Sequence, residues 1–190
     1  MTTTSTSEIV WERDLTRAKE RVARERKVLL IDVMKVPCRG CARLDAETYT
    51  DPRLIEAVTN RFVPLKLNLF EDPREVVRPL DVIWTPTILF ADRRGTVHHR
   101  SLNFLPPDLF LILLDLGEAI VDLYWSRHDH AIAMLGNAYD GAPDSQFAPE
   151  LLYWLGIAGY LKTHGDDDMY RPWNLLRQRF PDSIWSARVP

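Results

Sequence analysis

Cysteine is scarce in this sequence, and this excludes the class of small proteins that are held together by several disulfides. Only two of the 190 residues are cysteines, Cys38 and Cys41. One pair of thiols cannot form the framework of several disulfides that holds many small secreted proteins together. Structural zinc takes four ligands, and the sequence has no second C-x-x-C motif. His98 and His99 could complete such a site only if the chain folded them close to the cysteines.

The sequence also lacks a charge excess, a long apolar run and a leader-like N-terminus. It has 24 basic and 27 acidic residues, so no excess of positive charge indicates binding to nucleic acid. The apolar run from Val28 to Val33, interrupted by Asp32, is far too short to span a bilayer. Residues 1–7 contain neither a basic region nor an apolar segment, so we expect a disordered tail rather than a secretory signal. A cytoplasmic location follows as an expectation, and paired cysteines there are more often catalytic or metal-binding than structural.

The first two thirds of the chain alternate between strand and helix patterns. An apolar content of 46% is that of an ordinary globular protein. The order predicts a layered α/β domain with a central mixed sheet. The expected strands are 28–34, 62–69, 87–91 and 96–100, the last two forming a hairpin around Arg94-Gly95. The expected helices run from Ile9 to about Glu25 with Asp14 as cap, from Cys38 to a break near Thr50-Asp51-Pro52, from Arg53 to Asn60, from Asp72-Pro73 to before Pro79, and from Pro106 to Tyr124.

After Tyr124 the pattern is helical only, and it repeats. Gly117 and Gly156 are 39 residues apart, and Pro143 and Pro181 are 38 residues apart. Each unit consists of a helix, a turn and a second helix stopped by proline. This is similar to a tetratricopeptide-type helical hairpin, although its period is longer than the usual value of about 34. We therefore expect two domains, 9–124 and 125–190, with the helical extension packed on the α/β domain.

Four separated features suggest redox chemistry. Cys38-x-x-Cys41 lies where a strand passes into a helix, and a helix N-terminus stabilises a thiolate. Asp32, six residues earlier in an apolar strand, could exchange a proton with the buried thiol of Cys41, or it could simply bond to local backbone. Lys66 in the next strand could partner Asp32 or could extend its ammonium group to solvent. Finally, Trp84-Thr85-Pro86 precedes a strand, where a cis-proline could expose backbone to an extended peptide.

These residues resemble the thioredoxin superfamily over roughly 11–124. The matching motifs are Leu30-Ile31-Asp32 before C-x-x-C, Lys66-Leu67-Asn68, Thr85-Pro86-Thr87 before a hairpin, and the turn from Asp92 to Gly95. The resemblance implies a thioredoxin-like three-layer fold followed by all-α hairpins. It also implies Cys38 as the attacking thiol, Cys41 as the resolving thiol, Asp32 as the buried proton acceptor and Pro86 as a cis-proline.

Two positions depart from the usual family pattern. Val36-Pro37 stands where the family usually has a tryptophan before the first cysteine, and Arg39-Gly40 replaces the common Gly-Pro pair. The cation of Arg39 should favour the thiolate and the reduced form. We therefore expect a more oxidising couple than that of ordinary thioredoxin, which is about −270 mV.

The leading functional hypothesis is a thiol–disulfide oxidoreductase. Its catalytic candidates are Cys38, Cys41, Asp32 and Lys66, and its client-binding candidates are Thr85, Pro86, Trp84 and Arg39, although Trp84 could serve in packing alone. It needs a disulfide-containing protein client and an external reductant protein, but no organic cofactor. We expect no metal site, because Asp166-Asp167-Asp168 lacks the alternating ligands of a calcium loop. The alternative is an interaction module whose helical tail binds a partner, with the first domain as a scaffold or redox sensor.

Overall fold

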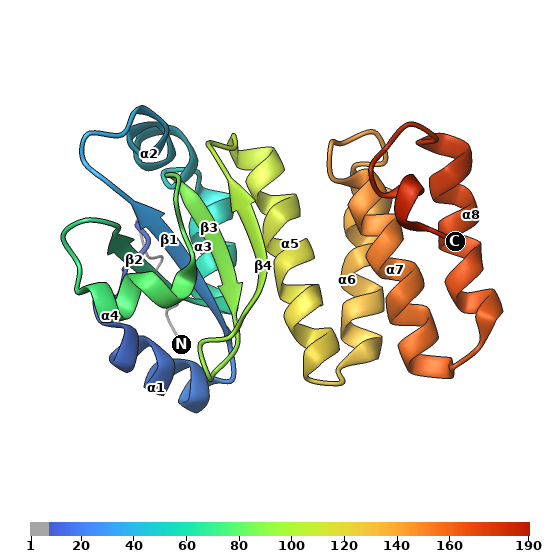
Figure 1. Cartoon of the computed structure of the whole chain (residues 1–190), viewed down its shortest axis with the longest axis horizontal. Helices are drawn as coiled ribbons and strands as arrows, with labels where there is room; N and C mark the ends of the chain where they lie inside the picture. The colour runs from blue at the N-terminus through green and yellow to red at the C-terminus, as the bar shows by residue number, and fades with distance from the viewer. Residues whose placement is uncertain (1–7) are drawn as a thin grey trace. The chain divides into compact units, whose positions relative to one another are not determined.

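The structure is a computed structural model that describes residues 8–190 (Figure 1). It divides into two compact units, the first ending at Leu111 and the second running from Ile112 to Pro190. The tail expected at residues 1–7 lies outside the described residues. Each unit is described by itself below.

A four-stranded mixed sheet forms the centre of the first unit. Its strands are β1 (Val28–Met34), β2 (Phe62–Asn68), β3 (Thr87–Ala91) and β4 (Val97–Leu102), in the order β2-β1-β3-β4. β1 runs parallel to β2 and antiparallel to β3, while β3 and β4 form the expected hairpin. The continuous apolar strands β1 and β3 are central and buried, as the sequence predicts. The mixed α/β architecture is therefore confirmed.

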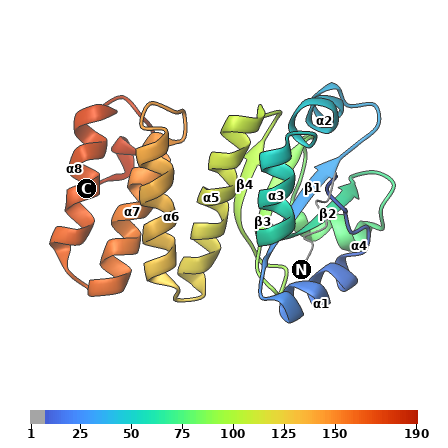
Figure 2. The same cartoon turned by 180° about the vertical axis from the view of Figure 1, so that it is seen from behind.

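Helices cover both faces of this sheet. Because side chains alternate along a strand, Leu29, Ile31 and Val33 point to one face. That face packs against α1 (Leu15–Glu25) and the segment of α4 (Arg74–Val77) and η2 (Arg78–Leu80). α3 (Pro52–Arg61) contacts β2 and lies in front of the sheet when the unit is seen from behind (Figure 2). Asp32 alternates with the apolar residues of β1, so it belongs to the second face.

The first helix starts later than the sequence suggests. α1 begins at Leu15, with the Asp14 carboxylate accepting the Arg17 N–H at 2.7 Å, so Asp14 is the cap. The preceding residues are extended, because the Glu12 backbone pairs with β2 through Pro64 and Lys66. This pairing satisfies backbone groups at the edge of the sheet, which an earlier helix could not do. The expected helical start at Ile9 is therefore wrong.

A rare helical segment follows the cysteine pair. The short helix α2 (Arg39–Arg43) continues directly into a π-helical turn, η1 (Leu44–Thr48). Its backbone bond runs from Tyr49 N to Leu44 O over 2.8 Å, five residues back. The buried Thr48 hydroxyl donates to Leu105 O at 2.6 Å, which connects this turn to the segment that precedes α5 (Pro107–Tyr124). The break expected near Thr50-Asp51-Pro52 separates this turn from α3.

The second unit contains only helices. α6 (His128–Gly141), α7 (Ala148–Thr163) and α8 (Asp166–Arg179) follow α5, and Pro143 and Pro181 come after α6 and α8. α7 and α8 approach closely, since a Cβ built at Gly159 would lie 2.7 Å from Asp168 O. The helical C-terminal part is thus confirmed, while its tetratricopeptide-like character stays a prediction. Over residues 8–190, no helix is long and apolar enough to cross a membrane.

Candidate active site

The two cysteines form a disulfide at the start of α2. Their Cα atoms are 5.3 Å apart, and Cys38 is the N-cap residue of the helix. Cys38 Sγ accepts the backbone N–H of Cys41 at 3.1 Å, while Cys41 itself is only 3% exposed. Cys38 remains partly exposed. A backbone donor aimed at an accessible sulfur favours its thiolate form, and the geometry distinguishes this outer sulfur from the buried sulfur of Cys41.

The Thr85–Pro86 loop lies directly against the disulfide. The Thr85–Pro86 peptide bond is cis, as is Val36–Pro37 before the cysteines. The Thr85 hydroxyl lies 3.6 Å from Cys38 Sγ, within range of a weak hydrogen bond to sulfur. On the other side, a Cβ built at Gly40 would lie 2.9 Å from Pro86 Cδ. Gly40 therefore allows α2 to approach a loop that a bulkier residue would push away.

This close approach predicts that two glycine-to-alanine substitutions change the free energy of unfolding in opposite directions. Gly40→Ala should lower the free energy of unfolding of the oxidised protein by about 1–3 kcal/mol, because the new methyl group overpacks against Pro86. The matched change Gly136→Ala in α6, where nothing lies within 4 Å, should instead stabilise by about 1 kcal/mol. Urea unfolding of both variants tests this. Stabilisation by both changes would show that the Pro86 loop yields without strain.

Asp32 and Lys66 are neighbours in the parallel register of β1 and β2. The Asp32 side chain is 1% exposed, and its Oδ2 lies 3.4 Å from Lys66 Nζ. Neither Asp32 oxygen forms a regular hydrogen bond within residues 8–190. Burial raises the pKa of Asp32 to about 6, although the charge of Lys66 and the Tyr49 hydroxyl partly oppose this. Asp32 can therefore hold or release a proton near neutral pH.

The sequence reasoning missed two residues that join this pair. Asp45 forms a short ion pair with Lys66 Nζ, and the Tyr49 ring centroid lies 5.0 Å from the same nitrogen. Tyr49 is buried, which raises the pKa of its hydroxyl, and the nearby Asp32 charge raises it further. Asp45 could have been found from its spacing, because it is four residues after Cys41 and such residues share a helix face. No comparable spacing connects Tyr49 to Asp32.

The remaining candidates lie on the exposed rim of the site. Arg39 is exposed and helps to line a hollow of about 450 Å³ that runs along the cysteine loop from Met34 to Asp45. Trp84 is 59% exposed, and its indole N–H donates to Asn103 Oδ1 at 2.8 Å. Trp84 is therefore largely exposed rather than packed in the core. The structure thus brings Cys38, Thr85 and Pro86 together, links Asp32 to Lys66, and leaves Arg39 and Trp84 facing solvent.

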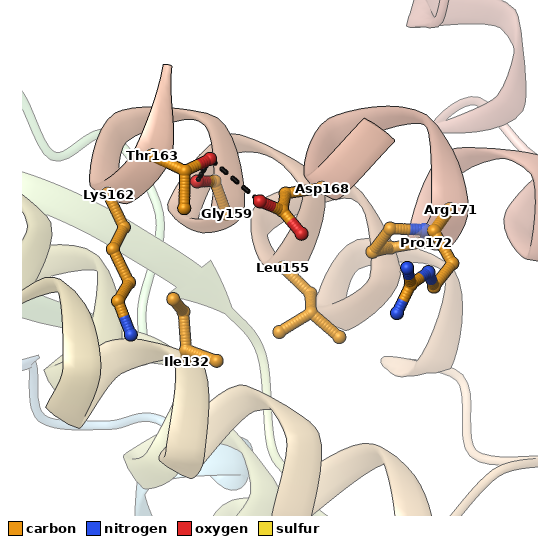
Figure 3. A pocket seen from close by; sticks show the side chains of 8 residues that line it. All are labelled: Ile132, Leu155, Gly159, Lys162, Thr163, Asp168, Arg171 and Pro172. Atoms are coloured by element: carbon orange, nitrogen blue, oxygen red, sulfur yellow. Dashed lines mark hydrogen bonds between the residues drawn. The ribbon is translucent and has the colours of Figure 1, made fainter. Parts of the chain in front are cut away.

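The helical unit has a hollow of its own, of about 280 Å³, between α6, α7 and α8. Figure 3 shows Leu155 and Ile132 at its base, Lys162 and Arg171 toward its two sides, and the Thr163 hydroxyl bonded to Asp168 at 2.7 Å. The hollow is not an aromatic groove, because none of the residues that line it is aromatic. Tyr153, outside the lining, stacks on Trp173 with ring centroids 5.9 Å apart. Tyr160, on the same helix α7, is 38% exposed.

One group of side chains in the helical unit has the composition of a metal site. Ligand atoms of Glu118, Asp122 and His130 all lie within 4.8 Å of one another. Asp122 is fully buried, but it is already engaged by His130 Nδ1 at 2.5 Å and by the Arg127 guanidinium. A fixed cation on the central carboxylate opposes a second cation at the same oxygens. The group is best explained as a structural ion-pair network.

Comparison with known proteins adds independent support for the fold. Residues 15–118 match the family model described as the thioredoxin-like domain. A thioredoxin from Thermus thermophilus is 20% identical, with a TM-score of 0.50, covering 56% of this chain and 85% of that chain. A putative disulphide-isomerase from Bacteroides thetaiotaomicron is 24% identical, with a TM-score of 0.52, covering 59% and 94%. A DsbH oxidoreductase is 12% identical, with a TM-score of 0.51, covering 62% and 90%.

A comparison with curated protein sequences returned no significant match. The likeness to the solved structures, at these identities, concerns the fold. The family model, in contrast, spans more than half of the chain and includes both cysteines, Asp32, Lys66 and Pro86. The chain therefore belongs to the thioredoxin-like domain family.

Proposed function

We propose that this protein is a thiol–disulfide oxidoreductase that exchanges its Cys38–Cys41 pair with disulfides of protein clients. One observation carries the proposal: a partly exposed Cys38 sulfur that accepts the Cys41 N–H and lies beside the Thr85–Pro86 loop. The membership of the thioredoxin-like domain family supports this kind of function. So do structural neighbours that are named as a thioredoxin, a disulphide-isomerase and an oxidoreductase.

In the proposed reaction, the thiolate of Cys38 attacks one sulfur of the client disulfide. The client's other sulfur leaves with the electron pair, and a mixed disulfide remains on Cys38. Cys41 then loses its proton, with Asp32 as acceptor, and attacks Cys38 to close the Cys38–Cys41 disulfide. The client leaves as a dithiol, reduced by two electrons. Thr85 and Pro86 would hold the client segment in extended form, with Trp84 and Arg39 at its edges.

The cycle requires an electron donor, because each turnover leaves the cysteine pair oxidised. We propose an external reductant protein in this role and no organic cofactor, since thiol–disulfide exchange needs sulfur alone. The cytoplasmic location belongs to the same proposal and can be tested by cell fractionation. Arg39 is expected to make the couple more oxidising than ordinary thioredoxin, at about −270 mV, and equilibration with glutathione measures this.

Trapping is the direct test of the proposed function. Cys41→Ala should retain attack by Cys38 but should not release the client, so mixed disulfides should accumulate on Cys38. They can be resolved on non-reducing gels and should disappear when a reductant is added. Cys38→Ser is the matched control and should capture nothing through sulfur. Equal capture by both variants would contradict the proposal.

A second candidate function is binding of a protein partner by the helical unit. It is supported by the amphipathic hollow in Figure 3, in which Lys162 and Arg171 flank an apolar base. A partner retained by the double variant Cys38→Ser/Cys41→Ala, with no disulfide involved, would favour this function. The trapping experiment therefore distinguishes the two candidates.

A further inference from the structure

The π-helical turn after the cysteines places two side chains against Lys66. In η1 the backbone bond spans five residues, from Tyr49 N to Leu44 O. Residues four apart share a face of a helical turn, so Asp45 and Tyr49 face the same way. Asp45 pairs with Lys66 Nζ, and the Tyr49 ring lies 5.0 Å from that nitrogen. Asp45 and Tyr49, in and directly after this turn, therefore contact the ammonium group from the same side.

The groups around Lys66 come from three parts of the first unit. β1 supplies the Asp32 carboxylate at 3.4 Å, and η1 with its following residue supplies Asp45 and Tyr49. The N-terminal segment supplies the Trp11 ring, whose centroid is 5.2 Å from Nζ. Glu12, next to Trp11, is engaged by Arg21 at 3.3 Å. Lys66 thus joins two carboxylates, and the rings of Trp11 and Tyr49 lie near its ammonium group.

These two carboxylates differ in their access to solvent. The side chains of Asp32 and Lys66 are 1% and 6% exposed, whereas that of Asp45 is 49% exposed. Asp45 also lines the hollow beside Cys38 and Cys41. The three side chains therefore form a continuous polar path from the buried face of β1 to the solvent next to the disulfide.

We propose that Asp45 is the outlet through which the proton of Cys41 reaches solvent, by way of Asp32 and Lys66. This inference rests on the function proposed above. The Cys41 S–H bond breaks, its sulfur bonds to Cys38, and the client sulfur leaves with the electron pair of the mixed disulfide. The proton passes to Asp32. Lys66 then gives one proton to Asp45 while taking one from Asp32, and Asp45 releases its proton to water.

Asp45 acts through Lys66 rather than on a reacting atom, so the test must separate the two chemical steps. The reduced full-length protein is mixed with the chromogenic disulfide 5,5′-dithiobis(2-nitrobenzoate) in a stopped-flow instrument. Attack by Cys38 releases a first thionitrobenzoate at a rate that depends on reagent concentration. Closure by Cys41 releases the second at a rate that does not. The second phase therefore isolates the step in which Cys41 loses its proton.

Asp45→Asn should slow the second phase about tenfold in the pH range where its rate is maximal. This effect is smaller than that of losing a general base, because water can partly replace Asp45 as the proton outlet. The first phase should stay unchanged. Added formate, a small carboxylate, should restore the second phase, as should Asp45→Glu. Glu47→Gln is the matched control, because Glu47 lies in the same turn but pairs with the exposed Arg43. It should leave both phases unaltered.

Three outcomes would overturn the inference. The first is an unchanged second phase in Asp45→Asn or, should that variant fail to fold, in the smaller Asp45→Ser. The second is a shift in the pH at which the second phase reaches half of its maximal rate, with that maximal rate unchanged. Asp45 would then act only through its charge on Asp32. The third is a slow phase that formate does not restore. Absence of the first phase in the unsubstituted protein would instead refute the proposed function, so the two failures are distinguishable.

Discussion

Replacing Lys66 with methionine is expected to lower the free energy of unfolding by about 3–5 kcal/mol at pH 8, the effect of leaving a buried charge without its partner. Asp32 is 1% exposed, and Lys66 supplies its neutralising charge at 3.4 Å. The methionine fills similar volume, so the loss is electrostatic. At pH 4 Asp32 is protonated, because burial raises its pKa to about 6, and the loss should be much smaller. Urea unfolding at the two pH values measures the difference.

Two further variants make this prediction specific. The double variant Asp32→Asn/Lys66→Met should recover most of the lost stability at pH 8, because no buried charge then remains. Lys27→Met is the matched control for the loss of a lysine charge. Lys27 is 23% exposed and pairs with Glu25, so its replacement should change stability by about 1 kcal/mol or less. An equal loss for Lys66→Met at both pH values would indicate a packing defect instead.

The second large effect is expected from Asp32→Asn, which should stabilise the protein above pH 6 by about 3 kcal/mol. The pKa of Asp32 is raised from 3.8 to about 6, with burial as the largest cause. Well below the unfolded pKa of 3.8, both the folded and unfolded chains hold the proton, and the carboxyl group carries no ionisation penalty. Between pH 3.8 and 6 the unfolded chain releases this proton while the folded chain retains it, so stability falls across that range and levels off above pH 6. Asparagine never ionises, so this part of the pH dependence should disappear.

The same substitution should impair the proposed reaction. Without the carboxylate that accepts the proton of Cys41, closure of the disulfide should slow by about a hundredfold, the lower end for a general base. Asp32→Asn should therefore raise stability but lower the rate of disulfide closure. A carboxylate with only a structural role would not show this combination. Equal stability of Asp32→Asn and the unsubstituted protein at both pH 4 and pH 8 would contradict the raised pKa. Urea unfolding and the stopped-flow second phase provide the two measurements.

Local patterns were sufficient to predict most of the fold. The apolar runs at 28–34 and 87–91 became the central strands β1 and β3, and the helix from Pro106 to Tyr124 matches α5 to within a residue at its start. These segments are long and strongly patterned, so tertiary contacts had little to change. The region before Leu15 behaved differently. Its helical spacing was overridden because the edge of β2 offers backbone partners to an extended Glu12.

The candidate site was predictable only in part. Cys38, Cys41 and the turn before Thr87 could be recognised because their chemistry lies in contiguous motifs. The ion pair between Asp32 and Lys66 could be suggested from neighbouring strands, and the parallel register places them side by side. Asp45 and Tyr49, which contact Lys66, lie in and directly after a π-helical turn. No sequence pattern signalled that turn, because it differs from an α-helical turn by one hydrogen bond.

The sequence by itself determined which groups can do chemistry here: one thiol pair, one acid in an apolar strand and one lysine in the next. Tertiary structure decided which of these groups meet and which reach solvent. Gly40 lets α2 pack beside Pro86 while Cys38 stays partly exposed, and Lys66 contacts both Asp32 and Asp45. Composition and spacing describe only residues that are close in sequence. The burial and the pKa of Asp32 depend on neighbours that are distant in sequence.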